Sequence, residues 1–143
     1  MEQDRIANLD VLILCGGFGT RLKEVDKGRP KPMVEIHGCP FLDILIQYVS
    51  SFGLRRFILC TGFKSEVIEQ HFYKKNDGNT YIVSKEQEAL GTGGGIKNAE
   101  ASILSFPFMV LNGDSICRIN LKNFVEFHKS NNASASMALA AIG

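Results

Sequence analysis

The sequence predicts an α/β fold with a mostly parallel central sheet that carries helices on both faces. Short apolar runs rich in β-branched residues alternate with segments whose apolar residues recur at helical spacing. The connections are short, and no internal repeat, low-complexity tract or linker interrupts the alternation. This alternation is typical of a parallel sheet enclosed between two layers of helices.

Each expected strand is a short apolar run that ends at turn residues. The runs cover residues 11–15, 57–60, 80–83 and 108–111, with further extended segments at 33–36 and 136–142. The last segment has no successor to pair with, so we expect a single domain over residues 1–143 that is incomplete at its C-terminus. Its sheet would leave an open edge that invites pairing with another chain.

Four amphipathic helices are expected between the strands. Their inward faces are Leu42, Leu45, Ile46 and Val49; Val67, Ile68 and Phe72; Ile96, Ala99, Ile103 and Leu104; and Phe124, Val125 and Phe127. Ser65, Thr92 and Asn120 are the expected N-caps, because their side-chain oxygens can accept hydrogen bonds from the first turn. Gly53 is expected to end the first helix.

The composition is that of one globular domain with an ordinary core. Of the 143 residues, 45% are apolar and 22% are charged, and the net charge is +1. Such a charge offers no polyelectrolyte surface, so neither nucleic acid nor a membrane is expected as a partner. Residues 1–10 lack the apolar core of a signal peptide, so the protein is expected in the cytoplasm.

The cysteines and histidines show no metal-binding spacing. Cys15, Cys39, Cys60 and Cys117 include no Cys-x-x-Cys pair and lie on or beside apolar runs, so we expect reduced, buried thiols. The three histidines lie far apart in sequence and are expected on the surface or at helix ends, without chemistry.

A glycine-rich segment follows the first expected strand. Gly16, Gly17 and Gly19 leave backbone N–H groups uncovered, so these groups can approach a phosphate closely and point at it. Arg21 and Lys31 add two cations, which suit a polyphosphate better than a single phosphate. The structural alternative is a glycine turn between strand and helix with two solvated cations.

Two common nucleotide-binding motifs are absent. The dinucleotide fingerprint fails because Leu22 takes the place of its third glycine, and no Gly-Lys-Ser or Gly-Lys-Thr occurs. The combined pattern Gly-Gly-x-Gly-Thr-Arg-Leu with a downstream Pro-Lys-Pro instead resembles the signature of the sugar nucleotidyltransferases. The resemblance covers essentially the whole chain, while family members continue beyond it with sugar-contacting elements and a second metal-binding aspartate.

This resemblance implies a Rossmann-like three-layer α/β/α fold and an enzyme that joins a nucleoside triphosphate to a sugar 1-phosphate, releasing pyrophosphate. It implies catalytic roles for Arg21 on the pyrophosphate, Lys31 on the α-phosphoryl oxygens and Asp114. The expected nucleotide-binding residues are Leu14, Cys15, Gly16, Gly17, Gly19, Thr20, Arg21, Lys31, Glu86, Gly91 and Thr92.

A second distinctive segment, residues 86–95, follows the expected strand at 80–83. Considered alone, its glycines predict a flexible loop and a helix start. In the sugar nucleotidyltransferases a similar Leu-Gly-Thr segment helps hold the base, and a polar side chain five residues before its glycine reads the base edge. Here that residue is Glu86, whose carboxylate only accepts hydrogen bonds and so favours guanine, which presents two adjacent donors.

The Leu-Gly-Thr-Gly-Gly form looks closest to bacterial guanylyltransferases acting on heptose 1-phosphate or mannose 1-phosphate. That resemblance implies GTP and a sugar 1-phosphate as partners, in the synthesis of surface-polysaccharide precursors such as those of lipopolysaccharide. A homo-oligomer stays open. So do a uridylyl- or thymidylyltransferase for a hexose 1-phosphate and a non-catalytic nucleotide-binding module, while a dinucleotide-dependent oxidoreductase is a remote third reading.

Asp114 ends the strand at 108–111 in the sequence Asn-Gly-Asp. It would serve either as a turn residue or as a hard oxygen ligand, and Asn-Gly-Asp resembles the family's first metal-binding aspartate, which implies Mg²⁺ as cofactor. Because ligands bind at the carboxyl ends of parallel strands, the glycine loop, Glu86 and Asp114 are expected to form one site.

Overall fold

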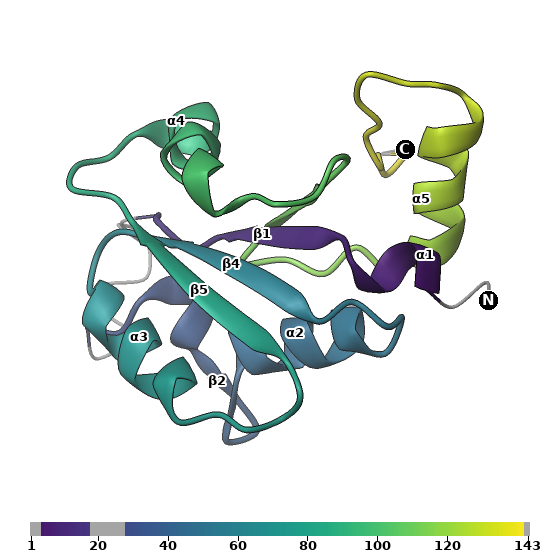
Figure 1. Ribbon diagram of the computed structural model, residues 1–143. Helices are drawn as coiled ribbons and strands as arrows, with labels where there is room; N and C mark the ends of the chain where they lie inside the picture. Colours follow the sequence, from purple (N-terminus) through teal and green to yellow (C-terminus); the bar gives the residue numbers. More distant parts are fainter. Residues whose placement is uncertain (1–3, 18–27, 142–143) are drawn as a thin grey trace.

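The computed structural model describes residues 4–17 and 28–141, and its centre is a four-stranded sheet in which every pairing is parallel (Figure 1). The strand order is β5-β4-β1-β6. The strands are β1 (Asp10–Leu14), β4 (Arg56–Thr61), β5 (Thr80–Lys85) and β6 (Met109–Asn112), and a separate antiparallel pair joins β2 (Glu35–Ile36) to β3 (Cys39–Pro40). The predicted parallel strands therefore form within one or two residues of the expected bounds.

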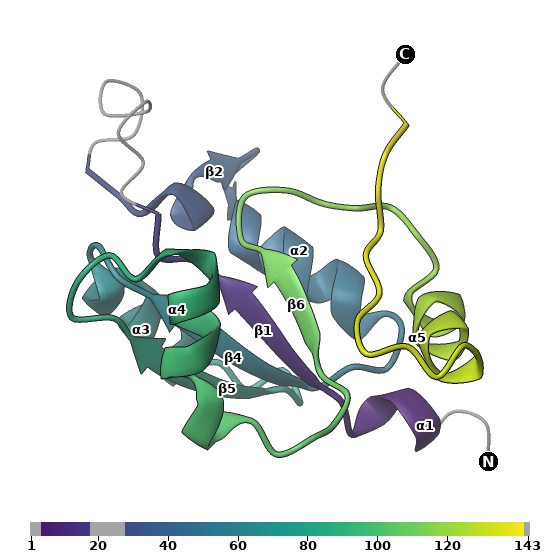
Figure 2. The same cartoon turned by 90° about the horizontal axis from the view of Figure 1, so that it is seen from above.

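Helices cover both faces of this sheet, which confirms the three-layer α/β/α prediction. The helices are α1 (Asp4–Ala7), α2 (Phe41–Ser50), α3 (Ser65–Tyr73), α4 (Gly91–Asn98) and α5 (Leu121–Ser130), with short 3₁₀ turns η1 (Lys31–Met33) and η2 (Glu100–Ser102). Figures 1 and 2 show α2 and α3 on one face and α4 on the other.

Side chains of the central strands alternate between the two faces, as the period of two dictates. On the α2 and α3 face, Val11 and Ile13 of β1 join one core cluster. On the α4 face, Leu12 packs in a second cluster with Ala99. Since both faces of β1 and β4 are buried, these strands appear in the sequence as continuous apolar runs.

The expected course of the helix after residue 92 is wrong at both ends. Thr92 lies inside α4 and does not cap it, because the residue before the helix is Leu90. The helix ends at Asn98, and the side chain of Leu104 is 79% exposed. The segment that follows is turned towards the sheet because the N–H groups of Leu104 and Ser105 donate to Asp10 Oδ2 at 2.5 and 2.8 Å.

Asp10 is a buried carboxylate at the start of β1. It therefore lies at the amino-terminal end of the parallel strands, away from the expected site at their carboxyl ends. It also pairs with the guanidinium of Arg56. Burial alone would raise the pKa of Asp10, but the hydrogen bonds from Ser105, Leu104 and Arg56 together hold it below its usual 3.8. The carboxylate thus fastens residues 104–105 to the sheet.

The two other predicted N-caps have opposite outcomes. Asn120 caps α5, with its side chain accepting from the Asn123 N–H at 3.1 Å. Ser65 is instead the first residue of α3, behind Lys64 at φ 52°, and its buried hydroxyl bonds to Thr61 at 2.7 Å. The predicted cap is therefore wrong by one residue.

Several smaller predictions also fail. Gly53 lies three residues beyond the end of α2, and Met33 belongs to η1. Phe127 is 59% exposed, whereas Phe124 and Val125 pack against the core as expected. The expected extended segment at 136–142 forms no strand over its described residues 136–141.

The cysteine prediction holds only in part. Cys15 and Cys60 are buried free thiols, Cys39 is partly buried, and Cys117 is exposed because it lies in the loop between β6 and α5. Of the histidines, His71 and His128 lie in the last turns of α3 and α5, as expected.

Candidate functional site

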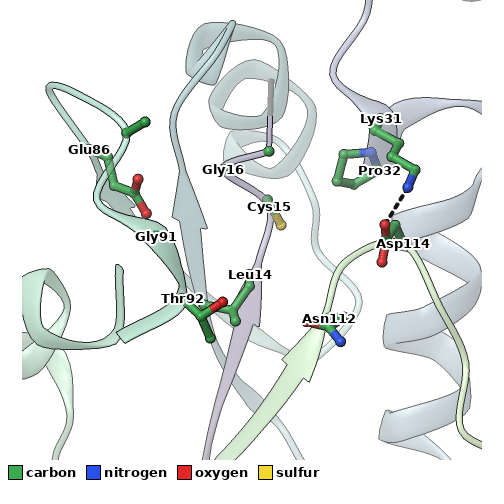
Figure 3. Close-up of a pocket in the computed structure, with 12 residues that line it drawn as sticks. Leu14, Cys15, Gly16, Lys31, Pro32, Glu86, Gly91, Thr92, Asn112 and Asp114 are labelled. Atoms are coloured by element: carbon green, nitrogen blue, oxygen red, sulfur yellow. Dashed lines mark hydrogen bonds and ion pairs between the residues drawn. The ribbon is translucent and has the colours of Figure 1, made fainter. Parts of the chain in front are cut away.

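A pocket of about 340 Å³ opens where β1, β5 and β6 reach their carboxyl ends (Figure 3). This volume is typical of a small-molecule site. Its lining consists of Leu14, Cys15, Gly16, Gly17, Lys31, Pro32, Glu86, Ala89, Gly91, Thr92, Asn112 and Asp114. The structure thus gathers all the expected site residues that it describes, while Gly19, Thr20 and Arg21 lie outside the described part of the chain.

Gly16 is closely packed against neighbouring segments. A Cβ atom placed on it would lie 3.2 Å from Glu86 Oε1, and one placed on Gly62 would lie 3.3 Å from the Gly16 carbonyl oxygen. By contrast, a Cβ on Gly17 would meet nothing within 4 Å. Gly16 is therefore glycine because of close packing, while Gly17 leaves its backbone open towards the pocket.

Glu86 directly follows β5 and turns its carboxylate back over the end of β1. Its N–H donates to the Thr61 carbonyl at 2.7 Å, and its Oε2 accepts from the Leu90 N–H at 3.3 Å. A Cβ on Gly95 would lie only 2.6 Å from Glu86 Oε1, so this glycine leaves the space that the carboxylate occupies. Glu88, the other acidic residue nearby, is exposed and does not line the pocket.

Two buried thiols lie beneath the pocket. Burial, with the Glu86 carboxylate as a second cause, raises the pKa of Cys60 to about 11. Burial likewise raises the pKa of Cys15, with Cys60 adding to the effect. Both thiols stay protonated at neutral pH and line or support the pocket without nucleophilic character.

Lys31 and Asp114 form an ion pair at the other side of the pocket from Glu86 (Figure 3). Lys31 comes from η1 and Asp114 from the turn after β6, and their side chains are 42% and 39% exposed. Gly113 brings that turn close to β1, because its N–H donates to the Leu14 carbonyl at 2.9 Å. A Cβ there would lie 2.7 Å from the same oxygen.

Three lining residues were not predicted as site residues, although each neighbours one that was. Pro32 follows Lys31, Ala89 lies within the 86–95 segment, and Asn112 ends β6 two residues before Asp114. For Asn112, its position at the carboxyl end of a strand was the signal that could have identified it; for Pro32 and Ala89 the signal was their closeness in sequence to Lys31 and to Gly91.

The donor set for a metal is small. Residues 4–17 and 28–141 contain no group of three or more His, Cys, Asp or Glu side chains placed to hold a metal ion. Asp114 supplies one half-exposed carboxylate, and Mg²⁺ characteristically binds through one or two carboxylates plus substrate phosphates and water. The residues present therefore fit Mg²⁺ held jointly with a phosphate. In the same described ranges no helix is long and apolar enough to cross a membrane.

The pocket brings Gly16, Gly17, Lys31 and Asp114 together beside the carboxyl ends of a parallel sheet. This combination is typical of α/β proteins that bind phosphorylated ligands at the carboxyl ends of their strands. The chain belongs to the nucleotidyl transferase family, whose sequence pattern matches residues 10–142. The resemblance drawn from the two motifs is thereby confirmed.

Similar proteins of known activity are guanylyltransferases. The D-glycero-alpha-D-manno-heptose 1-phosphate guanylyltransferase of Aneurinibacillus thermoaerophilus is 38% identical over 131 residues, which cover 92% of this chain and 57% of that protein. The mannose-1-phosphate guanylyltransferase of Mycobacterium tuberculosis is 36% identical over 141 residues, covering 94% of this chain and 38% of that protein. The chain thus spans roughly half or less of these relatives.

Solved structures agree with the fold. HddC from Yersinia pseudotuberculosis, also determined in complex with GMP-PN, matches with a TM-score of 0.76 and 44% identity over 84% of this chain and 54% of HddC. A UDP-glucose pyrophosphorylase complexed with UDP-glucose matches with a TM-score of 0.72 at 20% identity, over 87% of this chain and 54% of that protein, a likeness of fold alone.

Proposed function

We propose that the protein transfers GMP from GTP to a sugar 1-phosphate, giving a GDP-sugar and pyrophosphate. The observation that carries this proposal is the placement of the Glu86 carboxylate in the same pocket as Lys31 and Asp114, on the opposite side. A carboxylate at one end suits the donor edge of guanine, and a cation with a metal-binding carboxylate at the other suits phosphates. The guanylyltransferase relatives and the GMP-PN complex of HddC support the choice of base.

The base would lie against Glu86 and the start of α4, where Gly91 and Thr92 line the pocket. Glu86 would accept from the N1–H and the exocyclic amine of guanine. Uracil and thymine offer only one N–H, flanked by carbonyl oxygens that would face the carboxylate lone pairs.

The phosphates would lie against Leu14 to Gly17 and continue along Gly19, Thr20 and Arg21. In this proposal Lys31 contacts the α-phosphoryl oxygens and Arg21 holds the pyrophosphate. Asp114 would hold Mg²⁺, which when bound supplies positive charge beside the α-phosphate. Because Lys31 is ion-paired with Asp114, both side chains would lie beside the α-phosphate in this binding mode.

The reaction would be an in-line displacement at the α-phosphorus. An oxygen of the sugar phosphate forms the new P–O bond, and the bond to the β-phosphate breaks, with its electron pair leaving on pyrophosphate. The nucleophile is already an anion, so no general base is required. The chain's task is to align two mutually repelling anions and to stabilise the spreading charge.

The sugar specificity and the assembly are further proposals. Heptose 1-phosphate and mannose 1-phosphate are the acceptors we favour, for surface-polysaccharide precursors such as those of lipopolysaccharide, from the names of the relatives. Free thiols at Cys15 and Cys60 support a cytoplasmic location. Within the described strands β6 has an open edge, which supports pairing with a second copy of the chain.

Calorimetric titration of the chain with GTP, UTP, CTP, ATP and dTTP, with and without Mg²⁺, tests the proposal. Binding of GTP at least tenfold tighter than UTP and dTTP is expected. Tighter binding of UTP or dTTP would favour a uridylyl- or thymidylyltransferase instead. A second assay uses a protein extended to the length of its relatives and measures pyrophosphate release from GTP when each sugar 1-phosphate is added. If that protein binds GTP but releases no pyrophosphate, a non-catalytic module is favoured.

A further inference from the structure

Asn112 lines the pocket without a role in the proposed chemistry. It is the last residue of β6, it is exposed, and its side-chain amide makes no hydrogen bond to any residue the structure describes. A polar side chain at the mouth of a site that bonds to nothing in the fold adds no stability there. Its donor and acceptor are therefore free for a ligand.

The strand register fixes the face on which Asn112 lies. Asn112 pairs with Leu14, and Val110 pairs with Leu12, in the parallel ladder between β6 and β1. Paired residues of neighbouring strands point to the same face, and Leu12 packs on the α4 face. Asn112 therefore lies on the α4 side of the sheet, together with Leu14 and the segment that carries Thr92.

Asn112 also lies between the two ends of the pocket. Figure 3 shows Asn112 next to Asp114, with Leu14 between Asn112 and the side that carries Thr92 and Glu86. Asp114 is only two residues further along the chain. In the proposed binding mode the base meets Glu86 and the α-phosphate meets Asp114, so the group between them is the ribose.

The chemistry of the carboxamide matches that group. Each ribose hydroxyl is both a donor and an acceptor, and an asparagine side chain offers two donors and an acceptor without charge. A phosphate would call for a cation, which Lys31 already provides nearby. We propose that Asn112 binds the ribose hydroxyls of the nucleotide; this inference rests on the proposed nucleotide site.

Calorimetric titration with GTP and with 2′,3′-dideoxy-GTP tests the inference. The wild-type chain should bind GTP about tenfold more tightly, the factor expected for one or two net hydrogen bonds. Asn112→Ala should bind GTP about tenfold more weakly and 2′,3′-dideoxy-GTP unchanged, so that the preference disappears. Because the side chain is exposed and unbonded, the variant should fold normally, which thermal denaturation checks.

Asn123→Ala is the matched control, since Asn123 is an exposed asparagine in α5, outside the pocket lining, and should keep the full preference. Retention of the preference in Asn112→Ala, or its loss only in Thr92→Val, would overturn the inference. If the wild type binds UTP more tightly than GTP, the guanine proposal fails. The role of Asn112 is then tested by comparing the affinities for UTP and 2′,3′-dideoxy-UTP. If the wild type binds no nucleotide, both proposals fail.

Discussion

Replacing Glu86 with glutamine changes one oxygen of the carboxylate at the proposed base end of the pocket into an amide donor. The shape of the side chain is preserved. The remaining carbonyl oxygen can still accept from the Leu90 N–H, which lies 3.3 Å from Glu86 Oε2 in the present structure. The fold should therefore tolerate Glu86→Gln. What changes is the hydrogen-bond pattern offered to the base, from acceptors only to one donor and one acceptor.

The expected change in binding free energy follows from leaving one buried hydrogen-bonding group of the protein–nucleotide complex without a partner. Such a loss costs about 1 to 3 kcal/mol, and about 1.4 kcal/mol corresponds to a factor of ten. The wild type should then prefer GTP over UTP by roughly tenfold to a hundredfold. Glu86→Gln should weaken GTP binding by about tenfold and strengthen UTP and dTTP binding, narrowing or reversing that preference.

The assay is calorimetric titration of both triphosphates, with Glu88→Gln as the matched control. Glu88 carries the same charge two residues away but lies outside the pocket, so its replacement should leave the ranking of triphosphates unchanged. An altered ranking in Glu88→Gln with an unchanged one in Glu86→Gln would refute the assignment of the base to Glu86. An effect in neither variant would mean that backbone groups select the base.

Three further changes probe the phosphate end, the carboxylate pocket and the fold. Lys31→Ala should weaken triphosphate binding in calorimetry by at least tenfold, while thermal unfolding changes little, because a half-exposed ion pair contributes about 0 to 1 kcal/mol; unchanged affinity would contradict its role. Gly95→Ala should reduce the preference for GTP, since the new Cβ would lie 2.6 Å from Glu86 Oε1 and must displace that carboxylate; an unaltered GTP-to-UTP ratio in calorimetry would argue against that placement. Asp10→Asn should lower the free energy of unfolding by about 3 kcal/mol in urea titrations at pH 7. Since the folded-state pKa of Asp10 lies below 3.8, this difference is fully present above that value and should shrink as the pH falls from it towards the folded-state pKa; a difference that stays constant as the pH falls below 3.8 would refute the assignment.

The parts of the fold that local sequence dictates could be predicted. β1 and β4 are buried on both faces, so their continuous apolar runs mark them within one residue. α4 was harder, because its first turns consist largely of glycines and carry no apolar periodicity. The course of the chain after α4 is held by Asp10, which accepts from the N–H of Leu104, 94 positions away. No local pattern of residues 91–104 contains that contact.

In the site, too, local sequence predicts which types of side chain are present, whereas their arrangement depends on contacts between segments distant in the sequence. A charged or polar residue just after a buried strand must lie at the sheet edge, so Glu86 and Asp114 could be assigned to one site from sequence alone. Strand ends alone do not distinguish Glu86 from Glu88, since both are carboxylates in the same loop; the choice of Glu86 comes from its spacing to Gly91 in the family resemblance. The position of the Glu86 carboxylate depends on two glycines on different elements, Gly16 after β1 and Gly95 in α4, whose missing side chains leave the space that it fills. A substitution at either glycine should therefore act on base selection as Glu86→Gln does, although neither glycine carries a group that could read a base.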